Sequence, residues 1–298
     1  MLRKRARALG VGFLRRNPRW TTPLLWMLKE ARPDVPMVLD FPVTPRPRYD
    51  LNHPHPRLHE IIAERSDAYA QTLTGFLDLE ADLLRIPRVA SGGAAEPCWR
   101  NPYQPVVDAA ALYCFVSTSN PRLYLEIGSG YSTSFTRRAI SDHRLQTRIV
   151  SIDPQPRAEI DAICDSVVRA PLEACDLSVF DELKKGDILF IDSSHRCFMN
   201  SDVSVLFLEI IPKLPPGVLV QIHDIFLPYD YPLEWVERYY AEQYLLAAYL
   251  LAGFPKCEIV LPNVFVTNDA RLRTILAPLW TAIEAVNPHG FAFWLRTL

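Results

Sequence analysis

The alternation of short apolar runs with helical patterns between residues 122 and 224 constrains the fold more than any other feature. The apolar runs that we expect to be strands occur at 122–128, 148–153, 166–170, 187–192 and 217–224. The segments that we expect to be helices lie between them, at 132–140, 158–165, 176–186 and 201–214. Strands that alternate with helices build a parallel sheet with helices on both faces. The predicted fold class is therefore α/β, with a doubly wound, mostly parallel sheet.

The flanking segments extend this prediction. Upstream, an Arg- and Pro-rich stretch at 1–50 precedes helical spacing at 56–84 and 106–117. Downstream, we expect a long helix at 233–253, strand material at 257–261 and 265–267, a helix at 274–286 and a last, antiparallel edge strand at 291–296. We divide the chain into a tail with a helical cap, 1–100, and a domain that contains the sheet, 101–298.

Composition and charge argue against several classes of protein. A net charge of −2 over 298 residues is no footprint for tight nucleic-acid binding. The six cysteines form no C-x-x-C pair, which argues against a zinc site and favours reduced thiols in a cytoplasmic protein. The sequence has no run of 18 apolar residues that would predict a transmembrane helix. Seven Arg and Lys residues among the first 20 favour a solvated basic tail, with contact to an anionic surface as the alternative.

Polar chemistry gathers where the predicted strands end. The first strand runs into Glu126-Ile-Gly-Ser-Gly130, the second ends at Asp153, the fourth at Asp192 and the fifth at His223-Asp224. In an open α/β sheet, ligands bind beyond the carboxyl ends of the strands. A single acid after a strand is common in turns. Acids after four strands of one sheet predict a ligand site at this edge.

The turn after the first strand indicates which ligand. Gly128 and Gly130 allow a tight turn and a close approach of backbone to ligand. The third glycine of a dinucleotide fingerprint is missing, and Glu126 precedes the turn, where a carboxylate suits an ammonium group better than a pyrophosphate. Asp153 stands where an acid can accept both hydroxyl protons of a ribose. Together these features describe S-adenosylmethionine.

These motifs resemble those of the class I S-adenosylmethionine-dependent methyltransferases. The finer resemblance is to a subgroup with D-S-S-H after the fourth strand and H-D after the fifth, here Asp192–His195 and His223-Asp224. It implies a seven-stranded Rossmann-like sheet and an S-adenosylmethionine-binding domain at 101–298. It also implies a set of cofactor-binding residues: Glu126, Gly128, Ser129, Gly130, Tyr131, Ser132, Asp153, Pro154 and Asp192. Many members have glycine where this sequence has Ser132.

The histidines are the candidates for catalysis. His195 and His223 follow neighbouring strands, beside Asp192 and Asp224, and an oxygen acceptor needs a base. We therefore assign His195, His223 and Asp192 as catalytic candidates, against the alternative of satisfied structural histidines. Asp192 and Asp224 could also hold Mg²⁺, as in the sugar and catechol O-methyltransferases that this sequence resembles. Imidazole at position 223 suits Mn²⁺ or Zn²⁺ better.

The aromatic loop after Asp224 and the segment 99–108 are candidate walls of the site. The loop contributes Phe226, Tyr229, Asp230, Tyr231 and Trp235, and the segment contributes Asn101, Tyr103 and Asp108. We expect methyl transfer to a small-molecule acceptor, at a hydroxyl of a sugar or secondary metabolite, in a protein that is compatible with a homo-oligomer. The rivals are an NAD-linked or nucleotide-sugar enzyme and a catalytically silent scaffold that binds the cofactor.

Overall fold

The computed structural model describes residues 45–90, 95–253, 257–285 and 287–298. The chain divides into two compact units, Met1–Pro45 and Arg46–Leu298, and the description below concerns the second. The predicted basic tail and part of the predicted loop at 91–97 lie outside the described residues. Within the described ranges, no helix is long and apolar enough to cross a bilayer.

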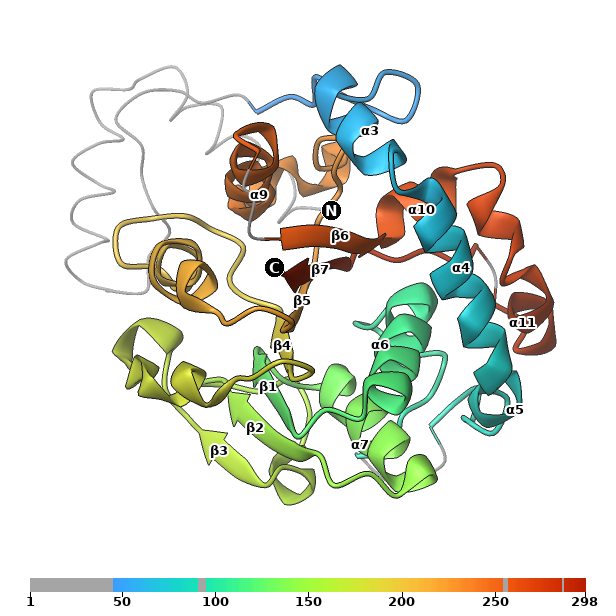
Figure 1. Cartoon of the computed structure of the whole chain (residues 1–298), viewed down its shortest axis with the longest axis vertical. Coiled ribbons are helices and arrows are strands. Elements are labelled where there is room, and N and C mark those ends of the chain that lie inside the picture. Colours follow the sequence, from blue (N-terminus) through green and yellow to red (C-terminus); the bar gives the residue numbers. More distant parts are fainter. Residues whose placement is uncertain (1–44, 91–94, 254–256, 286) are drawn as a thin grey trace, which may run out of the picture. The chain divides into compact units, whose positions relative to one another are not determined.

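A seven-stranded sheet forms the centre of the described chain, in the order β3-β2-β1-β4-β5-β7-β6 (Figure 1). The first five strands of this order are parallel, and β7 runs antiparallel to both β5 and β6. The strands are β1 Leu123–Ile127, β2 Arg148–Ile152, β3 Ser166–Val168, β4 Ile188–Ile191, β5 Leu219–Ile222, β6 Cys257–Pro262 and β7 Phe293–Thr297. The predicted doubly wound, mostly parallel sheet is confirmed.

The register of the sheet aligns the chemistry that the sequence places after the strands. Strand order reverses between β1 and β4, which is the switch point where ligands bind in such sheets. The last residues of four strands lie side by side: Ile127, Ile152, Ile191 and Ile222. The residues that follow them therefore emerge together at one edge: Gly128, Asp153, Asp192 and His223.

Helices cover both faces of this sheet (Figure 1). In Figure 1, α6 and α7 lie on one side of the parallel strands and α8 lies on the other. The helices are α3 Pro56–Ala63, α4 Ser66–Phe76, α5 Glu80–Leu83, α6 Val106–Ser119, α7 Tyr131–His143, α8 Asp202–Val205, α9 Glu242–Leu251, α10 Asn263–Asn268 and α11 Ala277–Ala282.

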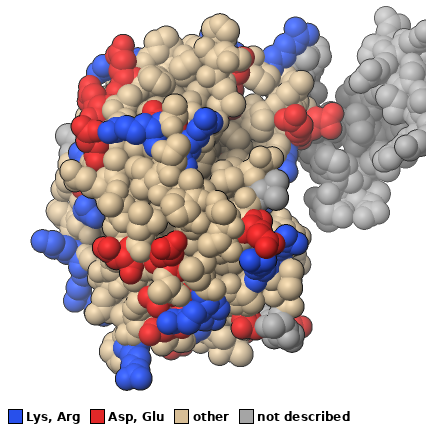
Figure 2. Space-filling view, turned by 90° about the vertical axis from the view of Figure 1, so that its right-hand side faces the viewer, with Lys and Arg blue, Asp and Glu red and all other residues tan. Residues whose placement is uncertain are grey.

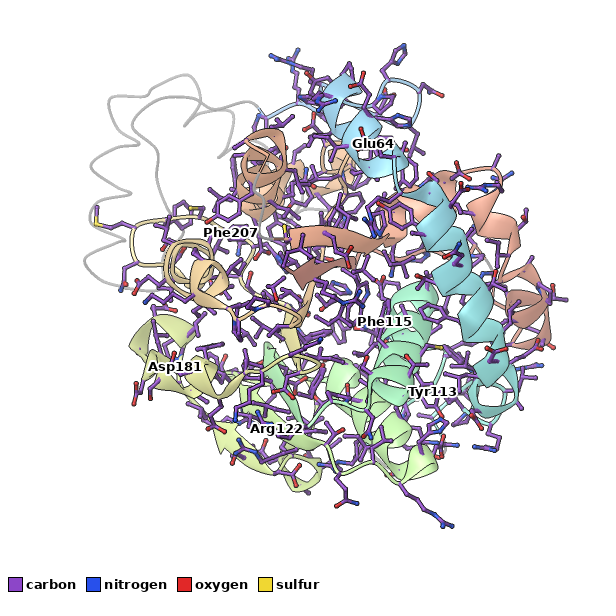
Figure 3. All side chains as sticks on the ribbon, in the orientation of Figure 1. Glu64, Tyr113, Phe115, Arg122, Asp181 and Phe207 are labelled. Atoms are coloured by element: carbon purple, nitrogen blue, oxygen red, sulfur yellow. The ribbon has the colours of Figure 1, made fainter. Side chains whose placement is uncertain are left out.

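Helix α6 is the centre of the hydrophobic core. Its residues from Val107 to Val116 are all buried, and α7 packs along it. Phe115 points from α6 into the middle of the molecule, where its ring lies 4.4 Å from that of Trp294 on β7 (Figure 3). Phe76 on α4 packs edge-on against the other side of Phe115, at 5.2 Å. Burial of such large rings is worth about 2–3 kcal/mol each.

The helices α3–α5 belong to the same compact unit as the sheet. Helix α4 packs on β6, and α3 packs on α9. Asp67 on α4 also forms an ion pair with Arg271, at 2.8 Å. Figure 2 shows acidic and basic side chains interspersed on the face of the molecule that it presents. The division at residue 100 and a capping role for the preceding helices stay predictions.

Two predicted helices between strands are only short 3₁₀ turns. Asp161–Ile163 (η2) replaces the helix expected at 158–165, and Leu177–Glu182 (η4) replaces most of the helix at 176–186. Arg169 binds the Asp161 side chain and the backbone carbonyl of Asp153, which draws the first segment down onto the sheet edge. Such long-range contacts override the local helical pattern.

The C-terminal predictions need three corrections. The long helix expected at 233–253 is broken into a 3₁₀ helix, Leu233–Arg238 (η7), and α9, because Tyr239 takes a left-handed conformation with φ of 55°. The residues 265–267, expected as a strand, lie in α10. Strand β7 is antiparallel as expected, but it lies inside the sheet and β6 forms the edge. The complete burial of Trp294 explains this interior position.

Candidate functional site

The turn after β1 packs directly against the turn after β4. Gly128 has φ of +79°, and a Cβ there would lie 1.9 Å from the carbonyl oxygen of Asp192. Its N–H donates to the carbonyl of Ile152, while the Asp192 N–H donates to the carbonyl of Ile127. Only glycine fits this conformation and this contact, since any side chain would push the two turns apart. The predicted need for glycine at 128 therefore has a clear physical cause.

Asp153 is held in place by the same turn. Its Oδ2 accepts the Ser129 N–H at 2.7 Å, and its Oδ1 accepts the Gln155 N–H at 2.7 Å. The Ser129 hydroxyl bonds to the Ser151 hydroxyl, also at 2.7 Å. Gly130 is the first cap of α7, and its N–H donates to Thr133 Oγ1. These bonds fix the carboxylate at the exposed end of β2, with the glycine turn beside it.

Glu126 lies behind the turn. Its carboxylate is completely buried and accepts hydrogen bonds from the hydroxyls of Thr133, at 2.6 Å, and Tyr124, at 3.3 Å. Burial raises the pKa of Glu126 to about 7, and the hydroxyl hydrogen bonds oppose that rise. The Glu126 side chain lines none of the cavities described below. The geometry therefore points to a brace for the turn, and the predicted contact with an ammonium group gains no support from it.

A cavity of about 380 Å³ opens at the carboxyl ends of β1, β2 and β4. Its size lies within the range of small-molecule pockets. Predicted cofactor residues among its lining are Gly128, Ser129, Asp153, Pro154 and Asp192. Apolar walls come from Ile127, Ile152, Pro171 and Leu172, and polar ones from Gln155, Arg157, Glu173, Ser193, Ser194, Ser201 and Asp202. We call this space the first cavity.

Besides Glu126, three more predicted cofactor residues lie outside the lining of the first cavity. Gly130 caps α7, as described above. Tyr131 packs its ring 6.0 Å from that of Tyr103. Ser132 is buried, and its hydroxyl lies 3.5 Å from Glu126, at the limit of a hydrogen bond. These residues shape the turn from behind.

His195 is locked between carboxylates. Its Nδ1 lies 2.8 Å from Glu242, and its Nε2 lies 3.1 Å from Asp192 and 3.4 Å from Asp224. Burial alone would lower the pKa of His195, but hydrogen bonds to Asp192 and Glu242 raise it well above its ordinary value. The imidazole is therefore cationic at neutral pH, with both nitrogens committed. That state does not suit a general base.

His223 has a similar environment but faces a cavity. Its Nδ1 lies 3.0 Å from Asp224, and its Nε2 lies 3.2 Å from Asp108 without hydrogen-bond geometry. Burial opposes the charged form, but these carboxylates raise the pKa of His223 well above its ordinary value. His223 is therefore also cationic at neutral pH, with a buried nitrogen that lacks a well-formed hydrogen bond.

Asp192 stands at the centre of this network. Burial alone would raise its pKa, yet the hydrogen bond from His195 and the charges of His223, His195 and Arg157 lower it to about 2. The side chain remains 25% exposed, and Oδ2 lies 3.9 Å from the Arg157 guanidinium. Asp192 is thus a fixed anion that reaches solvent-filled space, in contrast to the buried Glu126.

Asp192, His223 and Asp224 could together hold a metal ion. One ligand atom from each lies within 4.8 Å of the others. Asp224 has φ of 56°, a left-handed conformation that turns its carboxylate back toward both histidines. The sequence predicted Asp192 and Asp224 as metal ligands, and this grouping adds the imidazole of His223. The donor set of two carboxylates and one imidazole fits Mn²⁺ or Zn²⁺ better than Mg²⁺.

A second cavity of about 660 Å³ lies on the other side of Asp192. Its deep end contains His223 and Asp224, and its walls contain aromatic and cationic side chains. The predicted wall residues that line it are Asn101, Tyr103 and Trp235; other lining residues include Trp99, Arg157, Arg238, Tyr240, His289 and Phe291. The first and second cavities share two lining residues, Asp192 and Arg157.

The rest of the predicted aromatic loop supports this wall from behind. Phe226 and Tyr231 are buried in a small aromatic cluster with Trp235, and Tyr229 packs beside them. Asp230 has a different role, because its Oδ2 accepts the N–H groups of Arg48 and Tyr49. The loop thus fixes both a cavity wall and the path of the preceding chain.

The contacts of two buried acids and one cation have no clear signal in the sequence. The pattern predicts Glu242 only as part of a long helix, but it is fully buried against His195 and accepts hydrogen bonds from Ser193. Asp108 is predicted as a cavity wall, but it accepts the N–H groups of Phe291 and of Ala292 in the core. Arg157 lies 3.9 Å from Asp192, and the sequence does not predict that contact. An acid in an apolar helical stretch was the only available signal for Glu242.

The central part of the sequence matches a known family. Residues 125–225 match the model of a family described as a methyltransferase domain. This part of the chain is similar to a methyltransferase domain. The match begins within β1 and continues through β5, and it includes the turns that carry Gly128, Asp153, Asp192 and His223. No curated protein matches the sequence significantly.

Several solved structures resemble the chain distantly. An O-methyltransferase from Bacillus cereus in complex with SAH is 15% identical, with 76% of this chain and 91% of that chain covered and a TM-score of 0.42. The SAH-bound methyltransferase PaMTH1 from Podospora anserina is 13% identical, with 89% and 100% covered and a TM-score of 0.39. The O-methyltransferase TomG from Streptomyces achromogenes is 14% identical, with 82% and 97% covered and a TM-score of 0.37. Likeness at this level carries no inference about the ligand or acceptor of this chain.

Proposed function

We propose that the protein transfers the methyl group of S-adenosylmethionine to a hydroxyl of a small-molecule acceptor, a sugar or secondary metabolite. The observation that carries this proposal is the pair of cavities that meet at Asp192 and Arg157, two residues within the segment that matches a methyltransferase domain. The first cavity suits the cofactor and the second suits the acceptor. Their junction is where a methyl group would pass from one to the other.

The first cavity supplies the groups that a sulfonium nucleoside needs. Asp153 offers two fixed carboxylate oxygens to ribose hydroxyls, in exchange for its present backbone partners or alongside them. Pro154, Ile152 and Leu172 supply apolar surface for an adenine ring. Gly128 lets the ligand approach the backbone closely. Glu126 acts through Thr133 on the geometry of the turn, and we assign it no contact with the cofactor.

The reaction itself asks mainly for positioning. The cofactor supplies an electrophilic methyl group, so the protein must align acceptor and sulfonium in one line and handle the acceptor proton. His195 and His223 are poor candidates for the base, because their carboxylate partners hold both of them cationic. The predicted general-base role of these histidines is therefore replaced in this proposal by a metal-assisted one.

The proposed metal ligands are Asp192, Asp224 and His223, the last as a neutral imidazole, so that metal binding would displace its proton. Support comes from their convergence and from the buried His223 nitrogen without a well-formed hydrogen bond. A divalent cation held there would lower the pKa of an acceptor hydroxyl and neutralise the alkoxide charge. His195 and Glu242 would then orient Asp192 and Asp224 from behind, as outer hydrogen-bond partners commonly do for metal ligands.

Calorimetric titration with S-adenosylhomocysteine tests the cofactor site. Asp153→Ala should weaken binding by roughly 1.5–3 kcal/mol, because charge-assisted hydrogen bonds to the ribose are lost. Asp181→Ala is the matched control, since Asp181 is exposed on η4 and does not line the first cavity. Unchanged affinity in Asp153→Ala would remove that assignment. Binding of NAD without binding of S-adenosylhomocysteine would overturn the proposed function.

Mn²⁺ titration followed by electron paramagnetic resonance tests the metal centre. The wild-type protein and Asp181→Ala should bind one Mn²⁺, and Asp224→Asn should lose that ion, because one of its oxygen ligands becomes a weaker amide. Absence of Mn²⁺ binding, together with methyl transfer that survives a chelator, would eliminate the metal and leave the cofactor assignment intact.

A further inference from the structure

The wall of the second cavity is built from aromatic rings that lie in contact with one another. Trp235 lies 5.5 Å from Phe291 and 5.8 Å from Tyr240, both nearly perpendicular to it. Phe226 stacks behind Phe291 at 4.8 Å and fixes that ring. These contacts hold the rings in place before a ligand arrives. Rigid aromatic surface of this kind favours a flat ligand, because little side-chain freedom is lost on binding.

Guanidinium groups lie over the exposed faces of this wall. Arg238 stands 3.8 Å from the centre of the Trp235 ring and 5.5 Å from that of Tyr240. Arg157, which also lines the second cavity, stands 5.1 Å from the centre of the Tyr103 ring. Stacking orients a guanidinium while leaving its N–H groups free for an anion. Both arginines are exposed, whereas His223 and Asp224 are buried at the other end of the cavity.

The charges of these arginines are not matched by acids nearby. Among the described residues, Arg238 has no carboxylate within ion-pair distance, and the only one near Arg157 is Asp192, at 3.9 Å. Asp192 and Asp224 already have nitrogen partners, because His195 lies 3.1 Å from Asp192 and His223 lies 3.0 Å from Asp224. The outer half of the second cavity therefore carries unbalanced positive charge, while its inner half carries the proposed hydroxyl-activating centre.

We propose that the second cavity selects an aromatic acceptor that carries a carboxylate. Its ring stacks on the Trp235 and Phe291 wall, its carboxylate pairs with Arg238 and Arg157, and its hydroxyl points inward to Asp192 and Asp224. This inference rests on the proposed function and narrows its acceptor from sugars and metabolites in general to anionic arenes. A neutral sugar would use the rings but would gain nothing from the guanidinium groups.

The test compares two ligands that differ in one charge. We would titrate 3,4-dihydroxybenzoate and its neutral carboxamide into the protein saturated with S-adenosylhomocysteine, by calorimetry at low salt. The wild-type protein should bind the carboxylate about tenfold more tightly than the amide. In Arg238→Gln and Arg157→Gln this preference should fall to about twofold or less. Arg273→Gln is the control, because Arg273 is exposed and does not line the second cavity.

Each outcome decides the inference. Equal affinity for the two ligands in the wild-type protein, binding of neither, or an equal loss of preference in Arg273→Gln would overturn it. Thermal unfolding of each variant checks that the fold is retained. Titration of S-adenosylhomocysteine into the same samples distinguishes failure of the acceptor class from failure of the proposed function. Cofactor binding without a preference for the carboxylate would contradict only the acceptor class. Failure to bind the cofactor would contradict the proposed function as well.

Discussion

Glu126 and Asp192 show how two carboxylates at the same edge of one sheet acquire opposite properties. They belong to neighbouring strand ends, since Ile127 pairs with Ile191. Glu126 is surrounded by hydroxyl groups alone, so burial raises its pKa to about 7. Burial would do the same to Asp192, but the hydrogen bond from His195 and the nearby positive charges lower its pKa to about 2. The charge of the neighbours, more than burial, decides whether the pKa of a buried carboxylate rises, as for Glu126, or falls, as for Asp192.

The largest effect should come from removing the cation that balances the acids. His195→Ala leaves Glu242, Asp192 and Asp224 close together without the imidazolium, and breaking a buried ion pair of this kind costs about 3–5 kcal/mol. Urea denaturation at neutral pH measures the loss in unfolding free energy. His53→Ala, at an exposed histidine, should change it little. A loss below about 1 kcal/mol in His195→Ala would mean that the acids do not depend on this cation.

The raised pKa of Glu126 predicts that the free energy of unfolding depends on pH. The sign of this dependence is opposite to that of the contribution from Asp192. The folded protein binds the Glu126 proton more tightly than the unfolded chain, because the pKa is about 7 in the fold and 4.5 in the unfolded chain. Glu126 therefore favours the folded state at low pH, and the unfolding free energy should fall by about 3 kcal/mol as the pH rises through this window.

Glu126→Gln should abolish this fall, and Glu60→Gln, at an exposed acid, should keep it. The measurement is the unfolding free energy of each variant at a series of pH values from 4 to 8, relative to wild type. For Asp192 the sign of the pH dependence is reversed. Its lowered pKa stabilises the folded state above about pH 3.8, and this stability is lost as the pH falls toward 2. Parallel pH curves for wild type and Glu126→Gln would show that Glu126 is ionised as easily as in solvent.

Gly128 lies where the turn after β1 packs against the turn after β4, and a methyl group there should disturb both turns. Gly128→Ala places a Cβ 1.9 Å from the Asp192 carbonyl and forces alanine into φ of +79°. The expected destabilisation is about 2–3 kcal/mol, with weakened binding of S-adenosylhomocysteine. Gly75→Ala is the matched control: it has open space in α4 and should stabilise the helix by up to about 1 kcal/mol. Equal stability of both variants would contradict the close packing of the two turns.

The smallest changes in unfolding free energy should come from removing the hydroxyl groups near Glu126, and they should differ between Thr133 and Ser132. Thr133→Val removes a 2.6 Å hydrogen bond to the carboxylate and should cost about 1–2 kcal/mol at pH 8. Ser132→Ala removes a contact of 3.5 Å and should cost less than about 0.5 kcal/mol. The unfolding free energies of the pair check this order. The reverse order would mean that Ser132 is the main partner of Glu126.

The parallel part of the fold was predictable because its signals are local and repeated. Apolar runs of strand length, each followed by a turn, recur between residues 122 and 224, and the register then places their ends together without further information. The same logic located Gly128, Asp153, Asp192 and His223 at one edge. Predictions failed where long-range bonds decide local structure, as for the 3₁₀ turns at η2 and η4 and the break before α9.

The site was predictable in position but not in protonation. The sequence shows that His195 and His223 stand near acids, but it does not show how many acids surround each one. Glu242 lies 47 residues from His195, and Asp108 lies 115 residues before His223, so neither partnership has a sequence signal. These partners raise the pKa of both imidazoles, and the sequence alone does not show them. The hydroxyl partners of Glu126 on the following helix are likewise visible only in the fold.

The most direct test of the account is a crystal structure of the protein with S-adenosylhomocysteine bound. We expect the nucleoside in the first cavity, with its ribose on Asp153, its base beside Pro154 and its sulfur directed at the junction formed by Asp192 and Arg157. A nucleoside bound elsewhere on the molecule, or a sulfur that faces away from the second cavity, would contradict the claim that the two cavities form one methyl-transfer site.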